Sequence, residues 1–541
     1  MNIWVVLMYV QQSPSQFAFV SAPAQNRMNR SSFVLIFVCQ VFFCLVLLVL
    51  SFTYLPSIMM HVIRHELVIK EGSTFFNYWS KPPLNPEMRV YLFNYTNVER
   101  WMNGTDDVFH VEEVGPFVYE EEWRKTNVTF QDEERLVSYD LLKVFQFQSD
   151  RSHDDPHSNT ISIPNVPFLS ASAILKNSGM LSVMGFQSAL GTLEHVPEVF
   201  VSHSAHEILW GYDDPLVDLA SVFLPDEIRV PGQFGLFLGK NGTSDGRISV
   251  QSGKWNYKQA GHVQKWKGLD HFSVWNTDKC NQVSGFEGMM FPGPIVPNEP
   301  LALFVPDLCR SIPLVFQEDV EHYGMKTLRF GPHPDVFNYA HDENKCYCDP
   351  RTLTKPEMEQ WAIDFGSMGQ FDLSTINVPC VGQGLFDVSP CKFGAPLVVS
   401  WPHFLGTDSD LVPTITGLHP SETLHSFSMD FHPDLGLGLH AKIRLQINIR
   451  IHANPNLEQF KNVPASFDGM VLPIMWFEAT VDDLPDELVN LLHTSMSLGS
   501  QISHGLTWIL VLTLSLELGL FYAYPRWKTG RKMHASFEFD T

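Results

Sequence analysis

Two long apolar stretches, one near each end of the chain, limit its fold more than any other feature. They cover residues 33–54 and 506–524. Each is close to the ~20 residues that an α-helix needs to cross the hydrocarbon core of a bilayer. The sequence therefore predicts two transmembrane helices, with residues 55–505 between them as one large domain.

Basic residues lie next to each stretch on the side nearer the chain terminus, and they predict how the two helices are oriented in the membrane. They are Arg27 and Arg30 before the first stretch, and Arg526, Lys528, Arg531 and Lys532 after the second. The positive-inside rule places such residues in the cytosol. We therefore expect cytosolic tails at residues 1–32 and 525–541, and an ectodomain on the other side of the membrane.

The first stretch could also be a secretory signal peptide. It begins only after 32 residues, however, and no small-residue cleavage site follows it. We therefore interpret it as a membrane span. Translation from Met28 in place of Met1 would account for the short apolar segment at the start of the chain.

The ectodomain is acidic. The chain has 36 Lys and Arg residues against 59 Asp and Glu residues, a formal net charge of −23. Because the tails are basic, most of this charge falls between the spans, which argues against nucleic acid as a partner. The 22 histidines would take up protons at about pH 6, so acidification should change this surface strongly.

Cysteines and glycosylation sequons also indicate an extracellular domain. Two cysteines, Cys39 and Cys44, lie in the first apolar stretch. The other six are Cys280, Cys309, Cys346, Cys348, Cys380 and Cys391. An even number outside the cytosol predicts disulfides, although the residues alone leave the pairing open. N-glycosylation is predicted at Asn94, Asn103, Asn127 and Asn241.

A metal site is the alternative for some of these cysteines, because His341, Cys346 and Cys348 lie close together in the sequence. Their spacing does not match a zinc knuckle, and an oxidising exterior favours disulfides. We therefore expect no bound metal and no cofactor.

The pattern between the spans predicts a β-rich core with a helical insertion. Residues 441–451 alternate, with five apolar residues on one face and charged or amide residues on the other. This pattern is typical of a half-buried antiparallel strand. Shorter strands are predicted at residues 89–93, 116–119 and 396–400. Residues 167–209 instead predict two or three short helices, one of them at 204–210.

Eight short motifs occur in a fixed order between the spans. They are YLFNYTN (91–97), EEVGPFVYEEEWRKTNVTF (112–130), EILWGYDDP (207–215), CNQVSGFEGMMFP (280–292), DLCRSI (307–312), CYC (346–348), WPHFL (401–405) and LPIMWFE (472–478). Together with the two spans, they resemble the class B scavenger receptor family. That family includes platelet glycoprotein IV, the lysosomal integral membrane protein of type two and insect sensory neuron membrane proteins.

The resemblance implies an α+β fold. Its core would be an antiparallel β-barrel with short helices, capped at the membrane-distal end by a helical bundle. This bundle corresponds to residues 165–212, which we call the apical region. A hydrophobic tunnel would run through the ectodomain toward the bilayer. The resemblance further implies that Cys280 pairs with Cys346, Cys309 with Cys391, and Cys348 with Cys380. The third pair closes a longer loop than is usual in the family.

The resemblance also implies a function. Family members bind lipoproteins, fatty acids, sterols or apoptotic-cell lipids and move lipid to the membrane. Apolar surface in water costs about 25 cal/mol per Å², so a protein conduit would lower the barrier to transfer. We expect a cell-surface lipid receptor without catalytic residues, because no Gly-x-Ser-x-Gly or His-Glu-x-x-His motif is present. The tails carry no acidic dileucine signal, which favours the plasma membrane over the lysosome.

Other functions and a homo-oligomeric state remain open. The alternatives are a pH-dependent receptor for protein sorting or adhesion, and a chemosensory co-receptor for lipidic pheromones. In the family, lysines of the apical region attract anionic particles, but Glu194, His195 and Glu198 stand in the corresponding stretch. This favours a different or pH-dependent ligand, with His203 and His206 as further candidates. The alternative is that the three histidines, His195, His203 and His206, are solvated helix residues.

Each apolar stretch contains one strongly polar residue, Gln40 in the first and Glu517 in the second. Both are roughly 14 Å from the predicted cytosolic face at 1.5 Å per helical residue. Polar groups inside a membrane are costly and tend to pair. We predict that a protonated Glu517 forms a hydrogen bond with Gln40. The alternative is that Glu517 faces a neighbouring subunit or water.

Overall fold

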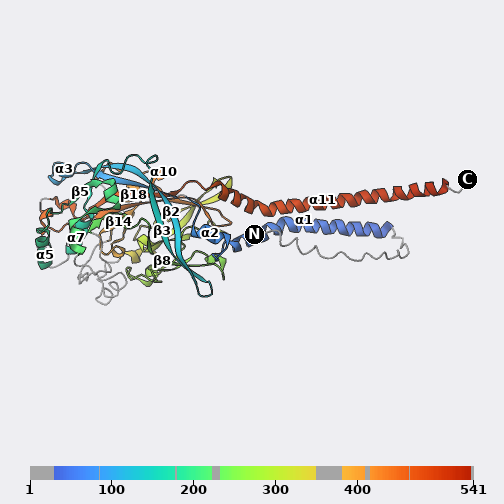
Figure 1. The fold of residues 1–541 in the computed structure, drawn as a ribbon, viewed down its shortest axis with the longest axis horizontal. Coiled ribbons are helices and arrows are strands. Elements are labelled where there is room, and N and C mark those ends of the chain that lie inside the picture. Colours follow the sequence, from blue (N-terminus) through green and yellow to red (C-terminus); the bar gives the residue numbers. More distant parts are fainter. Residues whose placement is uncertain are drawn as a thin grey trace. The chain divides into compact units, whose positions relative to one another are not determined.

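The computed structural model describes residues 30–84, 86–176, 180–221, 232–348, 380–408, 415–461 and 463–537. The chain forms two compact units (Figure 1). Residues 1–59 and 497–541 form the helical unit, and residues 60–496 form the ectodomain unit. Each unit is described by itself.

Two helices make up the helical unit. They are parts of α1 (Arg30–Glu66) and α11 (Asp486–Phe537). Both are long and apolar enough to cross a membrane. The hydroxyl of Ser503 donates to the backbone oxygen of Ser51 at 2.9 Å. A Cβ added at Gly499 would lie 3.1 Å from the Cα of Pro56. The two helices therefore pack closely through small residues, as helices do within bilayers.

One large sheet dominates the ectodomain unit. Its strands are β1 (Glu87–Tyr95), β2 (Phe109–Gln131), β3 (Leu136–Phe147), β8 (Thr243–Gln251), β9 (Val263–Trp266), β10 (Leu301–Val305), β11 (Arg310–His322), β12 (Met325–Pro332), β13 (Leu385–Asp387), β14 (Leu397–Ser400), β15 (Ile415–Thr416), β16 (Ser428–Phe431), β17 (Gly438–Arg450) and β18 (Val471–Val481). The main path runs β10-β11-β12-β16-β17-β18-β1-β2-β3-β8-β9. All pairings along it are antiparallel.

The two ends of this path approach each other, so the sheet is nearly closed. Gly285 and Phe286 lie between the end strands β9 and β10. Val263 donates its backbone N–H to Gly285 at 2.7 Å, and Phe286 donates its own to Ala302 at 2.7 Å. Closure of this kind protects edge strands from pairing with other chains. The predicted α+β class with a barrel-like antiparallel core is confirmed.

The ectodomain unit also contains short helices and two small two-stranded antiparallel sheets. The helices are α2 (Thr74–Ser80), α3 (Val98–Met102), α4 (Val166–Lys176), α5 (Met180–Leu190), α6 (Ala205–Trp210), α7 (Pro215–Ser221), α8 (Asp278–Asn281) and α10 (Glu422–His425). The small sheets pair β4 (Thr160–Pro164) with β5 (Phe200–Ser204), and β6 (Tyr212–Asp213) with β7 (Gln233–Phe234). The helices predicted between 167 and 209 are therefore α4, α5 and α6.

Strand β17 is where the sequence prediction and the structure differ most. The strand forms as predicted, but the face that we expected to be solvated is buried. Arg444 is 6 % exposed, and Gln446 and Asn448 are fully buried. Neighbouring segments cover this face: Gln446 accepts a hydrogen bond from the backbone of His403, and Asn448 donates to Val398. The polar face of β17 is therefore buried, while Ile443, Leu445 and Ile447 on its apolar face are half-buried.

Candidate functional site

The apical region begins at Asn165, which caps α4. The Asn165 side-chain oxygen accepts from the backbone N–H of Phe168 at 3.1 Å, as an N-cap residue does. Its amide nitrogen donates to the backbone oxygen of Glu198 at 2.8 Å. Asn165 therefore holds the start of α4 against the segment 191–199 that follows α5.

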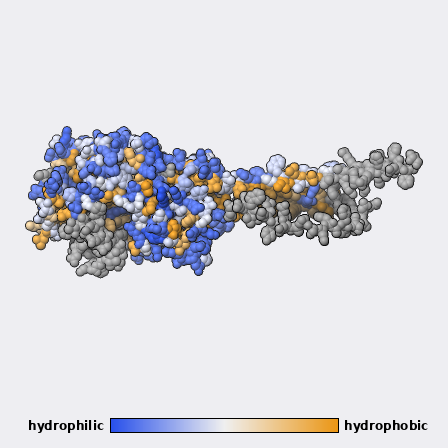
Figure 2. Space-filling model, viewed as in Figure 1, coloured by the Kyte–Doolittle hydropathy of each residue, from blue (hydrophilic) through white to orange (hydrophobic). Residues whose placement is uncertain are grey.

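Helix α5 exposes large apolar side chains. Met180 is 60 % exposed, Leu181 85 % and Met184 61 %, while Val183 and Leu190 are buried. In Figure 2, hydrophobic residues gather at the end of the ectodomain unit where Figure 1 labels α5. Clustered apolar exposure of this kind marks binding surfaces on soluble domains. We call Met180, Leu181 and Met184 the α5 patch.

The acidic residues predicted for the apex follow α5 in a turn. Glu194, His195 and Glu198 are all exposed, in a segment without helical structure. The alternative that His195 is a solvated helix residue agrees with its exposure but not with the absence of a helix in this segment. Helix α5 ends at Leu190, where Gly191 follows, and Pro197 disfavours another helix within the segment.

His203 and His206 lie further along, in β5 and α6. The His203 ring stacks on Tyr212 with ring centres 3.9 Å apart, and the His206 ring lies 4.2 Å from the ring of His157. Among the described residues, no hydrogen bond, ion pair or ring contact joins either of them to His195. The predicted candidates thus form two separate groups.

Burial lowers the pKa of His203, against the attraction of Glu207 and Asp214. Burial also lowers the pKa of His206, and the nearby charge of His157 lowers it further. Both rings therefore favour the neutral form in the folded protein.

This gives a prediction for acid pH. The folded state holds His206 less protonated than the unfolded chain, so unfolding takes up protons, and stability falls as the pH drops through the ordinary histidine range. His206→Gln should flatten this loss between about pH 7 and pH 5. Hydrogen exchange of residues 200–213 measures it. An identical pH dependence in the variant and the natural protein would contradict the assignment.

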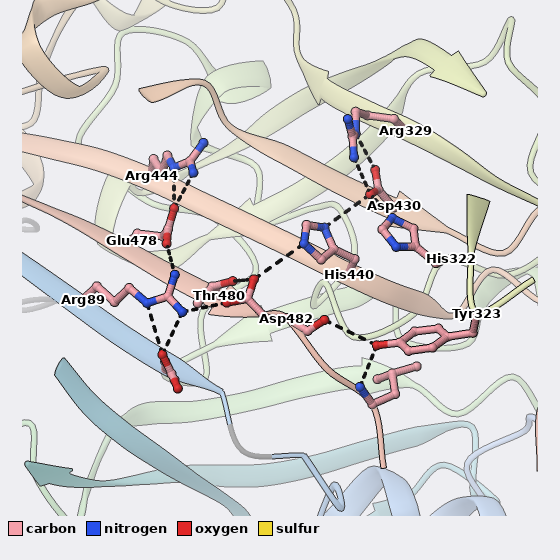
Figure 3. Close-up of polar contacts among 12 residues, drawn as sticks. Arg89, His322, Tyr323, Arg329, Asp430, His440, Arg444, Glu478, Thr480 and Asp482 are labelled. Atoms are coloured by element: carbon pink, nitrogen blue, oxygen red, sulfur yellow. Dashed lines mark hydrogen bonds and ion pairs between the residues drawn. The ribbon is translucent and has the colours of Figure 1, made fainter. Parts of the chain in front are cut away.

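Rows of polar residues cross the interior of the sheet (Figure 3). In the first row, strand register places Glu478 of β18 between Arg89 of β1 and Arg444 of β17. Arg444 Nε donates to Glu478 Oε2 at 2.6 Å, and Arg89 Nη1 donates to Oε1 at 2.8 Å. The Arg444 and Glu478 side chains are each only 7 % exposed. One carboxylate therefore satisfies two guanidinium groups.

A second buried polar group surrounds His403, within the predicted motif at 401–405. Its Nε2 lies 2.6 Å from Glu113 Oε2, which also accepts from Trp476 Nε1 at 2.7 Å. Burial would raise the pKa of Glu113, but the hydrogen bonds from His403 and Trp476 outweigh it and lower that pKa. Glu113 thus favours its charged form between His403 and Trp476.

The six ectodomain cysteines form three disulfides. The structure joins Cys280 to Cys346, Cys309 to Cys391 and Cys348 to Cys380. These are the pairs that the resemblance implies. Residues 349–379, within the loop of the third pair, lie outside the described residues.

The four predicted sequons all lie in the ectodomain unit. Asn103, Asn127 and Asn241 are exposed, and Asn94 is half-buried. The Asn94 side-chain oxygen accepts from the backbone of Ser162 at 2.9 Å, which leaves its amide nitrogen, the atom that carries a glycan, for modification.

The predicted polar pair is present within the helical unit. Gln40 Nε2 donates a hydrogen bond to Glu517 Oε1. Two helices long enough to span a membrane are thus joined by a contact between their polar residues, as expected for polar groups in an apolar environment.

Comparison with known proteins decides the family. The model of the CD36 family matches residues 37–524. The chain belongs to the CD36 family. Scavenger receptor class B member 1 of Bos taurus is 31 % identical over 436 residues, covering 80 % of this chain and 78 % of the relative. Lysosome membrane protein 2 is 30 % identical in Mus musculus and in Homo sapiens, covering 85 % of this chain and 86 % of the relative in each case.

Family membership explains the order of the sequence motifs, but those motifs do not mark every candidate residue. The α5 patch lies outside them, as do Arg89 and Arg444, whereas Glu113, His403, Trp476 and Glu478 lie within them. The patch carried a weak signal, since Met180, Leu181 and Met184 recur at helical spacing. The motifs mark several residues of the polar rows, but the partners Arg89 and Arg444 follow only from strand register.

Proposed function

We propose that this CD36-family protein is a cell-surface receptor that binds lipid-bearing particles at its apical region and passes lipid through its ectodomain to the membrane. The observation that carries the proposal is the α5 patch. Leu181 is 85 % exposed, and burying a leucine side chain against an apolar partner is worth about 1.5–3 kcal/mol. A lipid surface would cover it.

The charges around the patch favour neutral or zwitterionic particles. Glu194 and Glu198 are exposed in the segment after α5, and the chain as a whole carries a net charge of −23. An anionic particle would be repelled at low ionic strength, and salt would screen that repulsion. We therefore propose a phosphatidylcholine-coated particle as the ligand class, in contrast to the anionic particles that apical lysines would attract.

Transfer to the bilayer requires no chemical step. An apolar passage through the nearly closed sheet would let a sterol ester or fatty acid leave the particle without exposing its surface to water. Such exposure costs about 25 cal/mol per Å² of apolar surface. The proposed transfer consists of lipid binding and desolvation, so the proposal includes no cofactor and no catalytic residue. The same protein would act at the plasma membrane, with both tails in the cytosol.

A second candidate function is pH-dependent binding of a protein at the same region. It is favoured by the lowered pKa values of His203 and His206, which make the apical region sensitive to acid. One relative is named lysosome membrane protein 2, and a receptor that meets lysosomal pH could use such sensitivity to release a partner.

Mass spectrometry of lipids that copurify with the full-length protein tests the lipid proposal. We expect neutral lipids or fatty acids in stoichiometric amount, above the level found with an unrelated two-span protein purified in the same detergent. Equal lipid content in the two preparations would contradict an internal lipid passage and would favour the protein-binding alternative.

A further inference from the structure

Three side chains from three strands converge in the interior of the ectodomain unit (Figure 3). They are His322 at the end of β11, Asp430 in β16 and His440 in β17. His322 Nε2 lies 2.7 Å from Asp430 Oδ2, and His440 Nδ1 lies 3.3 Å from the same oxygen. All three atoms lie within 4.8 Å of one another. We call them the His-Asp-His cluster.

The His440 ring is oriented by a second carboxylate. Its Nε2 lies 3.6 Å from Asp482 Oδ1, which favours a proton on that nitrogen. Asp482 is itself held by Arg89 and by the hydroxyl of Thr480. A carboxylate behind a histidine fixes the tautomer and ring position of metal-binding histidines. With the proton on Nε2, Nδ1 would present a lone pair toward Asp430.

His440 Nδ1 is buried and makes no hydrogen bond among the described residues. Nδ1 and Asp430 Oδ2 face each other at 3.3 Å. Such an approach is favourable when a proton or a metal cation lies between the two atoms. Buried polar atoms without a partner are rare in folded proteins and call for an explanation.

We propose that the His-Asp-His cluster binds Zn²⁺. Two imidazole nitrogens and one carboxylate oxygen are ligands that zinc accepts, with a water in the fourth position. In a tetrahedral site with bonds of about 2.0–2.1 Å, ligand atoms are about 3.3 Å apart. The two measured spacings, 2.7 and 3.3 Å, lie near that value. The two rings stack with centres 4.9 Å apart, so both must turn for their nitrogens to reach one metal.

Arg329 holds the carboxylate of the cluster in place. Its Nε lies 2.8 Å from Asp430 Oδ1 and its Nη2 lies 2.9 Å from Oδ2. Asp430 is fully buried, so this pair fixes the plane of the carboxylate. Each carboxylate oxygen has two lone pairs, so Oδ2 can serve Arg329 and a metal together. The arginine also opposes the cation by its charge, which weakens binding but favours a precise geometry.

The metal would stabilise the fold. It would join β11, β16 and β17, and Tyr323 follows His322 directly. The Tyr323 hydroxyl accepts from the backbone of Leu484 at 2.8 Å, and its backbone oxygen lies 2.7 Å from His493 Nε2. Through Tyr323 the cluster is linked to the residues that lead into α11. Zinc would therefore rigidify β11, β16 and β17 at the positions of His322, Asp430 and His440 in the ectodomain unit.

The test uses the full-length protein in detergent, stripped with a chelator and titrated with Zn²⁺ or Co²⁺. We expect one equivalent of Co²⁺ to produce the visible absorption of a tetrahedral site, and Zn²⁺ to displace it and raise the Tm. His322→Ala should weaken binding by more than about 100-fold, because it removes a direct ligand. His341→Ala, which replaces an exposed histidine, is the matched control and should bind normally.

His322→Gln replaces His322→Ala if the latter loses its native melting transition, because glutamine preserves a polar contact with Asp430. Equal metal binding by the natural protein and the His322 variant would overturn the proposal, since the metal would then occupy other histidines. A Tm that rises at acid pH, with no saturable absorption change on adding Co²⁺, would also overturn the proposal. The cluster would then share a proton and not bind a metal.

Discussion

Replacing Leu181 and Met184 together with aspartate is expected to reduce binding of phosphatidylcholine-coated particles by about 100-fold or more. Each side chain gives up about 1.5–3 kcal/mol when its burial against a partner is lost, and each 1.4 kcal/mol is tenfold in affinity. Both are more than half exposed in the free protein, at 85 % and 61 %. The fold should therefore be unaffected, and the Tm should change little.

Ser188→Asp is the matched control, because it adds a charge at another exposed position of the same helix. It should bind normally at physiological ionic strength. Binding is measured by surface plasmon resonance with the full-length protein in nanodiscs. Normal particle binding by the Leu181 and Met184 variant would show that the ligand contacts a different surface.

Glu478→Gln should destabilise the ectodomain unit by about 3–5 kcal/mol, the usual cost of breaking a buried ion pair from one side. Glu478 is the shared partner of Arg89 and Arg444, and the Arg444 side chain is only 7 % exposed. The variant leaves a buried guanidinium without a counter-charge. The Tm should fall by about 3–5 °C in a domain of this size.

The same substitution at Glu318 gives a matched control. Glu318 accepts a hydrogen bond from Arg329 at 3.0 Å, but its side chain is 59 % exposed. Surface ion pairs contribute about 0–1 kcal/mol, so Glu318→Gln should change the Tm by a degree or less. Equal effects at the two positions, read by differential scanning fluorimetry, would contradict the central importance of the polar row.

Local patterns predict the strands of this fold well but do not predict what covers them. The alternation at 441–451 indicates a strand, and β17 forms there. The same alternation cannot tell whether the polar face meets water or protein, because the side-chain period is two in either case. Arg444, Gln446 and Asn448 are therefore buried contrary to prediction, and their partners come from segments distant in the sequence.

The two candidate sites also differ in how far local sequence patterns predict them. The α5 patch lies on a helix that composition had predicted. The His-Asp-His cluster arises from register instead: Arg329 pairs with Asp430 across β12 and β16, and Asp430 pairs with His440 across β16 and β17. His322 and Asp430 are 108 residues apart. Only the closed sheet brings such residues together, so no short motif could have marked them.

Selective lipid transfer is the most direct test of the central proposal. Proteoliposomes containing the full-length protein are mixed with phosphatidylcholine emulsion particles that carry a labelled cholesteryl ester and a non-exchangeable label on the particle surface. We expect the ester to enter the proteoliposome membrane faster than with protein-free liposomes, while the surface label stays outside. Particle binding without ester transfer, or transfer of both labels together, would contradict passage of lipid through the ectodomain.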